Sequence, residues 1–135
     1  MQENDVVLSV KDLFISFNTF AGRVNAIRGV DFELRRGETI AIVGESGSGK
    51  SVTVKSILGI RSKNEIVDRG EILFTYRAEN GEDRTENLLK LSDRDMQKRI
   101  RGRHIALVFQ DPLTSLNPTM TIGAQIAESV IKRRK

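Results

Sequence analysis

The sequence predicts an α/β fold in which an antiparallel β region precedes a strand, a glycine-rich loop and a helix. Apolar and polar residues alternate through most of the first third of the chain, as in strands with one buried face. A continuous apolar run, Thr39–Val43, then leads directly into the glycine-rich segment Gly44–Ser51. Three apolar residues follow at helical spacing: Val54, Ile57 and Leu58.

Three candidate strands make up the antiparallel region. The alternating positions fall in Val6–Val10, Leu13–Phe17 and Val30–Leu34. Turns are expected at Ala21–Arg23 and Arg36–Glu38, each of which is centred on a glycine. We therefore expect antiparallel strands with one face buried and the other solvated.

Two short apolar runs predict strands of a different kind. Ile40–Val43 and His104–Phe109 are continuous rather than alternating, which is typical of strands covered on both faces in a parallel sheet. The first run precedes the glycine-rich loop, and the second ends at Gln110–Pro112. Both are expected to be buried strands of the α/β core.

The charge-rich middle of the chain contains weaker signals. Glu71–Tyr76 alternates and predicts one more strand, and Glu79–Asp83 predicts a turn or flexible loop. Ser92 is a suitable N-cap for a short helix that runs to about Arg101. Near the C-terminal end, Ile122–Ile131 places its apolar residues on one helical face.

Composition excludes several classes of protein. The chain has 135 residues, no cysteine and a net charge of +4, so disulfide frameworks, zinc–thiolate sites and cysteine nucleophiles are excluded. Four basic residues lie at Lys132–Lys135, and without them acidic and basic residues balance. Aromatic residues make up only 5% of the chain, so interleaved stacking platforms are lacking. We expect no nucleic-acid partner, no signal peptide and no membrane-spanning segment.

The segment Gly44-x-x-x-x-Gly49-Lys50-Ser51 matches the P-loop pattern. Glycines let successive backbone N–H groups turn inward around phosphate oxygens, and the next helix adds its N-terminal N–H groups. Lys50 supplies a mobile positive charge, and Ser51 supplies a hydroxyl for Mg²⁺. The candidate nucleotide-binding residues are Gly44, Glu45, Ser46, Gly47, Ser48, Gly49, Lys50, Ser51 and Val52.

The context of this motif resembles the nucleotide-binding subunit of an ABC transporter. The resemblance rests on the strands before the loop and on Ile105–Pro112, whose Phe-Gln end resembles the Q-loop of that family. The extension Phe109–Pro118, together with Leu88–Leu91 and Ile100–Gly102, looks like the dipeptide/oligopeptide/nickel importer group. The resemblance covers essentially the whole chain and implies a P-loop NTPase of the ABC ATPase type.

The resemblance also implies roles for single residues. Lys50 and Gln110 would be catalytic, with ATP and Mg²⁺ as cofactors, and Ser51 and Gln110 would contact the metal. Phe17 is the candidate for stacking on adenine, Phe20 is the second choice, and ordinary core packing remains open for both. The partners implied are membrane-embedded permease subunits and a second ATPase subunit. The expected location is the cytoplasmic face of the membrane, where the chain would be peripheral and would energise peptide import.

The sequence departs from the family in what it lacks. It contains no Ser-Gly-Gly-Gln-like signature and no apolar strand ending in Asp-Glu, and its only histidine, His104, precedes the Q-loop strand. Residues 1–135 are therefore interpreted as the N-terminal portion of one ATP-binding domain with an incomplete core sheet. We expect weak Mg-ATP binding at most and no hydrolysis by the chain alone, and we assign His104 a structural role.

Two other readings of the P-loop remain. A small P-loop kinase would have an arginine-rich lid, which the arginines between Arg94 and Arg103 could imitate. A GTPase would have an Asn/Thr-Lys-x-Asp motif, which Thr53–Ser56 does not supply. A non-hydrolysing nucleotide-binding remnant is the third possibility.

Overall fold

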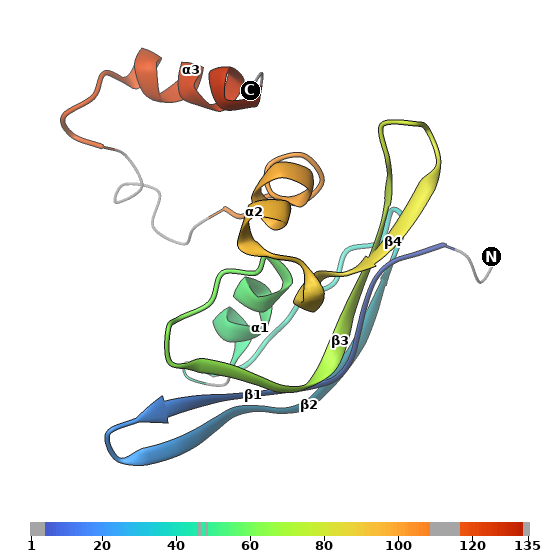
Figure 1. Ribbon diagram of the computed structural model, residues 1–135, viewed down its shortest axis with the longest axis vertical. Helices are drawn as coiled ribbons and strands as arrows, with labels where there is room; N and C mark the ends of the chain where they lie inside the picture. The colour runs from blue at the N-terminus through green and yellow to red at the C-terminus, as the bar shows by residue number, and fades with distance from the viewer. Residues whose placement is uncertain (1–4, 46, 48, 109–116, 134–135) are drawn as a thin grey trace. The chain divides into compact units, whose positions relative to one another are not determined.

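The computed structural model describes residues 5–45, 47, 49–108 and 117–133. The chain divides into two compact units, residues 1–105 and 106–135. In the first unit a sheet curves around short helices, and the second contains α3 (Figure 1). The elements are β1 (Val6–Thr19), β2 (Gly22–Arg35), α1 (Lys50–Ile57), β3 (Glu65–Arg77), β4 (Asp83–Asn87), η2 (Leu88–Lys90), α2 (Asp93–Asp95), η3 (Met96–Ile100) and α3 (Ile122–Arg133).

The four strands form one antiparallel sheet in the order β2-β1-β3-β4. The predicted strands Val6–Val10 and Leu13–Phe17 are confirmed, but they are two halves of one strand, β1. The turn at Ala21–Arg23 is confirmed as the tip of the hairpin that joins β1 to β2. Glu71–Tyr76 is confirmed within the longer β3.

A bulge at Asp12 divides the sheet into two arms. The pairing register of β1 shifts between Val10 and Leu13 on the β2 side and between Lys11 and Phe14 on the β3 side. Asp12 has a φ of 50°, and its backbone N–H donates to the Asp31 carboxylate at 2.9 Å. Such bulges bend a sheet and increase its twist. We call the pairing before the bulge the first arm and the pairing after it the second arm.

Gly70 on β3 is required by the bulge. Its φ is 118°, and a Cβ built there would lie 2.6 Å from the carbonyl oxygen of Asp12. Next to it, the Arg69 guanidinium pairs with Asp12 at 2.7 Å and lies 4.4 Å above the centre of the Phe14 ring. The bend is therefore fixed by backbone contact, an ion pair and a cation–π contact.

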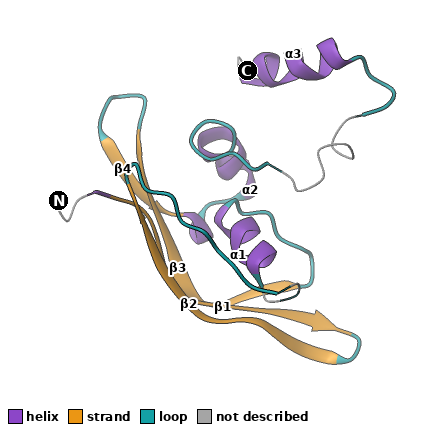
Figure 2. Cartoon of the chain, turned by 180° about the vertical axis from the view of Figure 1, so that it is seen from behind, coloured by secondary structure: helices purple, strands orange, loops and turns teal. Residues whose placement is uncertain are grey.

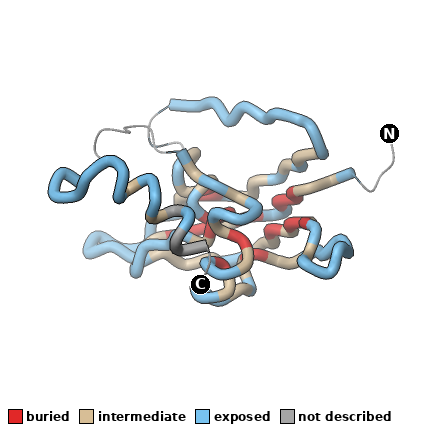
Figure 3. The backbone as a smooth tube through the Cα atoms, turned by 90° about the horizontal axis from the view of Figure 1, so that it is seen from above, coloured by how far each residue is buried: buried red, intermediate tan, exposed pale blue. Residues whose placement is uncertain are grey.

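The core lies on one face of this sheet. Val10, Leu13, Ile15 and Ile72 have no exposed surface, and they form one cluster with apolar residues of the helices. Buried segments gather in the middle of the strands while the tips are exposed (Figure 3). Burial of such a side chain stabilises a fold by roughly 1.5–3 kcal/mol. The helices contribute Ile57, Leu88, Met96 and Ile100.

The predicted short helix after Ser92 is confirmed as α2 followed by the wider turns of η3. The Ser92 hydroxyl accepts a hydrogen bond from the backbone N–H of Asp95 at 3.1 Å, as an N-cap does. Arg101 follows the helix and donates from Nε to the Leu58 carbonyl at 2.6 Å and from Nη2 to Gly59 at 2.9 Å. These bonds tie the end of α1 to the end of η3.

The two predicted buried strands are wrong within the described residues. Residues 36–45 form an extended loop (Figure 2), and the side chains of Ile40, Ile42 and Val43 are 38%, 43% and 87% exposed. Residues 104–108 also form no strand apart from one bridge between Arg101 and Ile105. The physical reason is that a strand exists through its neighbours, and no described strand pairs with either run.

The remaining predictions were closer to the structure. The Glu79–Asp83 turn is confirmed between β3 and β4, although β4 itself was not predicted. The predicted helix Ile122–Ile131 is confirmed as α3, where the Thr121 hydroxyl accepts from the Ala124 N–H at 3.2 Å. Within the described part of the chain, no helix is long and apolar enough to cross a membrane.

Candidate phosphate-binding site

The P-loop runs from Gly44 into the N-terminus of α1, which begins at Lys50. The Lys50 ammonium donates to the carbonyl oxygen of Gly44, so this side chain folds back over the loop from its last residue to its first. Lys50 is half-buried, whereas Glu45, Gly47 and Ser51 are exposed. The positive charge therefore lies at the mouth of the loop. Ser46 and Ser48, which were also predicted to bind phosphate, lie outside the described residues.

Gly49 lets the P-loop pack directly against the sheet. Its φ is 91°, and a Cβ built there would lie 2.6 Å from Cδ1 of Ile27 and 3.2 Å from the carbonyl oxygen of Ala26. Both neighbours belong to β2, in the second arm of the sheet. A Cβ at this position would have to displace the end of the Ile27 side chain and would be tight against the Ala26 carbonyl. Glycine is therefore favoured here by its positive φ and by the close approach of β2.

The first turn of α1 is suited to an anion. Gly49 provides no side chain that could cap the helix, and the first turn contains no acidic residue. The first N–H groups of an α-helix have no acceptor within the helix, and the helix dipole adds positive potential there. Lys50 and Ser51 lie in this turn, so a positive charge and a hydroxyl accompany the backbone donors.

Two hydroxyl groups on the inner face of α1 bond to carbonyl groups of the preceding turn. Val52 packs against the core, so only its backbone N–H is suited to contact a phosphate. The Thr53 hydroxyl donates to the Gly49 carbonyl at 2.9 Å, and the Ser56 hydroxyl donates to Val52 at 2.8 Å. These two buried hydroxyl groups therefore have partners although they face an apolar core.

The two phenylalanines proposed for the adenine differ in their surroundings. Phe17 lies in β1 opposite Val24 and is partly buried against the core. Phe20 lies in the hairpin tip and is fully exposed, at 115% of the reference surface. The core packing that the sequence left open is therefore present at Phe17. Adenine stacking by either ring stays a prediction.

Another predicted site residue is not among those that the structure describes. Gln110 and the rest of residues 109–116 lie outside the described residues. Among the described residues, no group of three or more carboxylate or imidazole side chains is arranged to hold a metal ion. Ser51 is thus the described candidate for Mg²⁺, as the P-loop pattern predicts.

A second cluster was missed by sequence reasoning. The arginines between Arg94 and Arg103 were considered as an imitation of a kinase lid, but Arg99 is half-buried and donates to Glu86 at 2.8 Å. Arg84 approaches the same Glu86 oxygen at 3.1 Å, and the Tyr76 hydroxyl donates to the other at 2.6 Å. The alternating charges of β4 were the available signal for this cluster. It was overlooked because β4 was not predicted.

The Glu86 carboxylate also affects the acidity of its neighbours. Burial first, and then the hydrogen bond to Glu86 and its negative charge, raise the pKa of Tyr76 above its ordinary value of 10.0. Burial opposes the charge of Arg99, but the nearby Glu86 carboxylate outweighs it and raises the pKa of Arg99. At neutral pH, Tyr76 is therefore a hydrogen-bond donor and Arg99 is a cation.

The chain is similar in sequence to known ATP-binding proteins. Residues 27–134 match the family model described as ABC transporter. The chain is 53% identical over 129 residues to the dipeptide transport ATP-binding protein of Lactococcus lactis subsp. cremoris, a match that covers 96% of the chain. It is also 53% identical over 130 residues to the oligopeptide transport ATP-binding protein of Bacillus subtilis, again over 96% of the chain.

These relatives are longer than the chain. The chain covers 34% of the Lactococcus protein and 34% of the Bacillus protein, so it spans about a third of their length. A third relative, the glutathione import ATP-binding protein of Salmonella choleraesuis, is 47% identical over 127 residues. That match covers 92% of the chain and 19% of the relative.

Proposed function

The chain belongs to the ABC transporter family, and from this we propose that it supplies the phosphate-binding part of an ATP site that energises peptide import. The observation that supports this proposal most directly is the packing of the P-loop against the sheet. Gly49 is packed against β2, α1 begins directly after it, and the Lys50 ammonium lies over the loop. This arrangement supports binding of a triphosphate.

The chemistry of each site residue suggests which part of Mg-ATP it would bind. Lys50 and the backbone N–H groups of Gly47 through Val52 would hold the phosphates, and Ser51 would hold Mg²⁺. When bound, Mg²⁺ neutralises part of the phosphate charge. Phe17, with Phe20 as the alternative, would stack on adenine, and Gln110 would contact the metal or the attacking water.

The substrate and partners are proposed from the relatives. The names of the Lactococcus and Bacillus relatives concern dipeptide and oligopeptide transport. We propose that the chain works with membrane-embedded permease subunits and a second ATPase subunit at the cytoplasmic face of the membrane, and we expect no nucleic-acid partner. Because the sequence contains no Ser-Gly-Gly-Gln-like signature, we expect nucleotide binding without turnover by the 135-residue chain.

The decisive experiment compares two lysines of the same helix. Lys50→Ala should weaken Mg-ATP binding, measured by titration calorimetry, by about tenfold or more, because it removes a charge-assisted contact to phosphate. Lys55→Ala is the matched control, since Lys55 is exposed in the last turn of α1. Equal affinities of the two variants would contradict the proposed site.

Three further measurements test the proposed nucleotide site. ATP should bind more tightly than GTP, and the opposite order would favour the GTPase reading. Phe17→Ala should lower ATP affinity more than Phe20→Ala does, and the reverse order would move the adenine to Phe20. ATP hydrolysis by the chain that is lost in Lys50→Ala would overturn the expectation of binding without turnover.

A further inference from the structure

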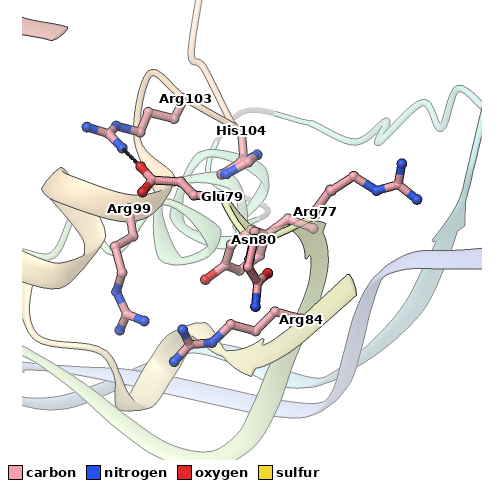
Figure 4. A pocket seen from close by; sticks show the side chains of 9 residues that line it. Arg77, Glu79, Asn80, Arg84, Arg99, Arg103 and His104 are labelled. Atoms are coloured by element: carbon pink, nitrogen blue, oxygen red, sulfur yellow. Dashed lines mark hydrogen bonds and ion pairs between the residues drawn. The ribbon is translucent and has the colours of Figure 1, made fainter. Parts of the chain in front are cut away.

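A cavity of about 540 Å³ lies between the tip of the β3–β4 hairpin and the turn that follows η3. We call it the arginine cleft because Arg77, Arg84, Arg99 and Arg103 line it, with His104 and Glu79 (Figure 4). None of its lining residues belongs to the P-loop or to α1. A cavity of this size is suited to a small molecule.

The lining of the cleft is more basic than acidic. Four of its nine lining residues are arginines and only one, Glu79, is acidic. The carboxylates that pair with the other arginines, Glu86 and Asp83, are not lining residues. The lining of the cleft therefore carries guanidinium groups without these two carboxylates. An anion in the cleft would meet positive charge first.

Arg84 and Arg99 are the strongest candidates to bind that anion. Both guanidinium groups approach the same Oε1 atom of Glu86, at 3.1 and 2.8 Å, so two cations share one carboxylate oxygen. Asp95 is 4.0 Å from Arg99, at the outer limit of ion pairing, and its side chain is 49% exposed. A guanidinium group has five N–H donors in a planar fork, so both arginines keep donors for a second acceptor.

The position of these two arginines is fixed by the carboxylate between them. Glu86 is only 13% exposed and accepts from Tyr76 on its second oxygen at 2.6 Å. The Tyr76 ring in turn lies 4.6 Å from the His104 ring. The guanidinium groups are therefore held before any ligand arrives, which lowers the cost of ordering them.

The pair between Arg103 and Glu79 closes the cleft only weakly. Its two atoms are 3.2 Å apart, but the Glu79 side chain is 93% exposed. Exposed pairs of this kind contribute little and are screened by salt. A ligand with two negative charges could therefore displace Glu79 from Arg103 at little cost.

We propose that the arginine cleft is a binding site for the phosphate group of a small molecule, separate from the P-loop. Phosphate suits the cleft because its several oxygens can accept from two guanidinium forks at once. Binding would join the β3–β4 hairpin to the turn at 101–104. This inference does not depend on the proposed nucleotide site, because the two sites share no residue.

The test uses NMR of the side-chain Nε–H groups of arginine in the whole chain carrying Lys50→Ala, which disables the P-loop. Inorganic phosphate and glycerol 3-phosphate are titrated separately, with succinate as a dicarboxylate control. Saturable shifts of Arg84 and Arg99 with phosphate, and weaker effects with succinate, are the expected result. Tighter binding of glycerol 3-phosphate than of inorganic phosphate would identify a phosphate ester as the ligand.

Variants of the arginines test whether phosphate binds in the arginine cleft. Arg84→Gln should weaken phosphate binding by about tenfold, and Arg84→Lys, which keeps the charge but loses the fork, should weaken it less. Arg94→Gln is the matched control, since Arg94 is exposed in α2 and does not line the cleft. Should Arg84→Gln fail to fold, Arg84→Lys decides. Shifts that do not saturate, that succinate reproduces, or that survive the Arg84 substitutions would overturn the proposal.

Discussion

The antiparallel sheet and the loop before α1 are both rich in apolar residues, but only the sheet is a folded β structure. Ile72 lies in β3 between two neighbouring strands and has no exposed surface. Ile42 lies in a similarly apolar run, yet it is 43% exposed and no described strand pairs with it. The same residue type is thus a core residue in one segment and a surface residue in the other.

This difference shows that strand formation depends on partners more than on composition. A strand in the sheet satisfies its N–H and C=O groups through neighbours that the chain itself provides. Residues 38–45 contain the same β-branched side chains without that pairing. The strands of the first unit therefore pair with one another, whereas the apolar run before the P-loop pairs with no described strand.

The largest expected effect comes from a matched pair of isoleucines. Ile72→Ala should lower the free energy of unfolding by about 3–5 kcal/mol, because it leaves a cavity in the core. Ile42→Ala should change it by less than about 0.5 kcal/mol. Urea unfolding of both variants measures the contrast. Similar losses for the two variants would show that the run before the P-loop is as well packed as the sheet.

The next effect compares two glycines with positive φ. Gly70→Ala should cost about 3 kcal/mol in unfolding free energy, because strain adds to a clash with the Asp12 carbonyl. Gly81 has a φ of 82° but nothing within 4 Å of an added Cβ, so Gly81→Ala should cost about 1 kcal/mol. Thermal unfolding measures both. Equal losses of unfolding free energy would mean that the positive φ, rather than the contact with Asp12 at the bulge, causes the destabilisation.

A smaller effect is expected at the helix cap. Ser92→Ala removes the acceptor for the Asp95 N–H and should lower the unfolding free energy by about 1 kcal/mol. Ser62→Ala is the control, since Ser62 is an exposed serine that bonds to Glu65 through its backbone N–H and C=O groups. A loss as large in the control would assign the effect to serine in general rather than to the cap.

The smallest effect is a shift in the titration of Tyr76, the only tyrosine in the chain. Because its pKa is raised in the folded state, its contribution to stability is complete below pH 10 and is lost as the pH rises through the folded pKa. Ultraviolet absorbance of the phenolate measures this pKa directly. Glu86→Gln should lower it, because the negative charge is removed, and an unchanged titration would leave burial as the whole cause.

Local signals were enough to predict the antiparallel part of the fold. Alternation identified both halves of β1 and the end of β2, and Ser92 identified the start of α2. The bulge at Asp12 was not predicted, because it depends on Asp31 and Gly70, which lie far along the chain. The run Ile40–Val43 was wrongly predicted as a strand, because periodicity cannot show whether a neighbour exists.

The P-loop and the arginine cleft also differ in how far the sequence predicts them. The P-loop was predictable because its residues are consecutive, and the position of Gly49 against β2 agrees with the role of glycine in the motif. The arginine cleft was not predictable, because Arg84 and Arg99 come from different elements and meet only at Glu86. A motif that is local in sequence can be recognised before folding, whereas a cluster made by folding cannot.

The bulge at Asp12 also limits where the length of the chain can vary. Deleting Asp12 would remove the extra residue of β1 and with it the bend of the sheet, although core residues such as Leu13 and Ile15 would keep their partners and faces. Insertions at the exposed hairpin tips, residues 20–21 and 79–82, would leave both arms in register. Length differences among natural variants of this domain should therefore accumulate at the tips and be absent from the bend.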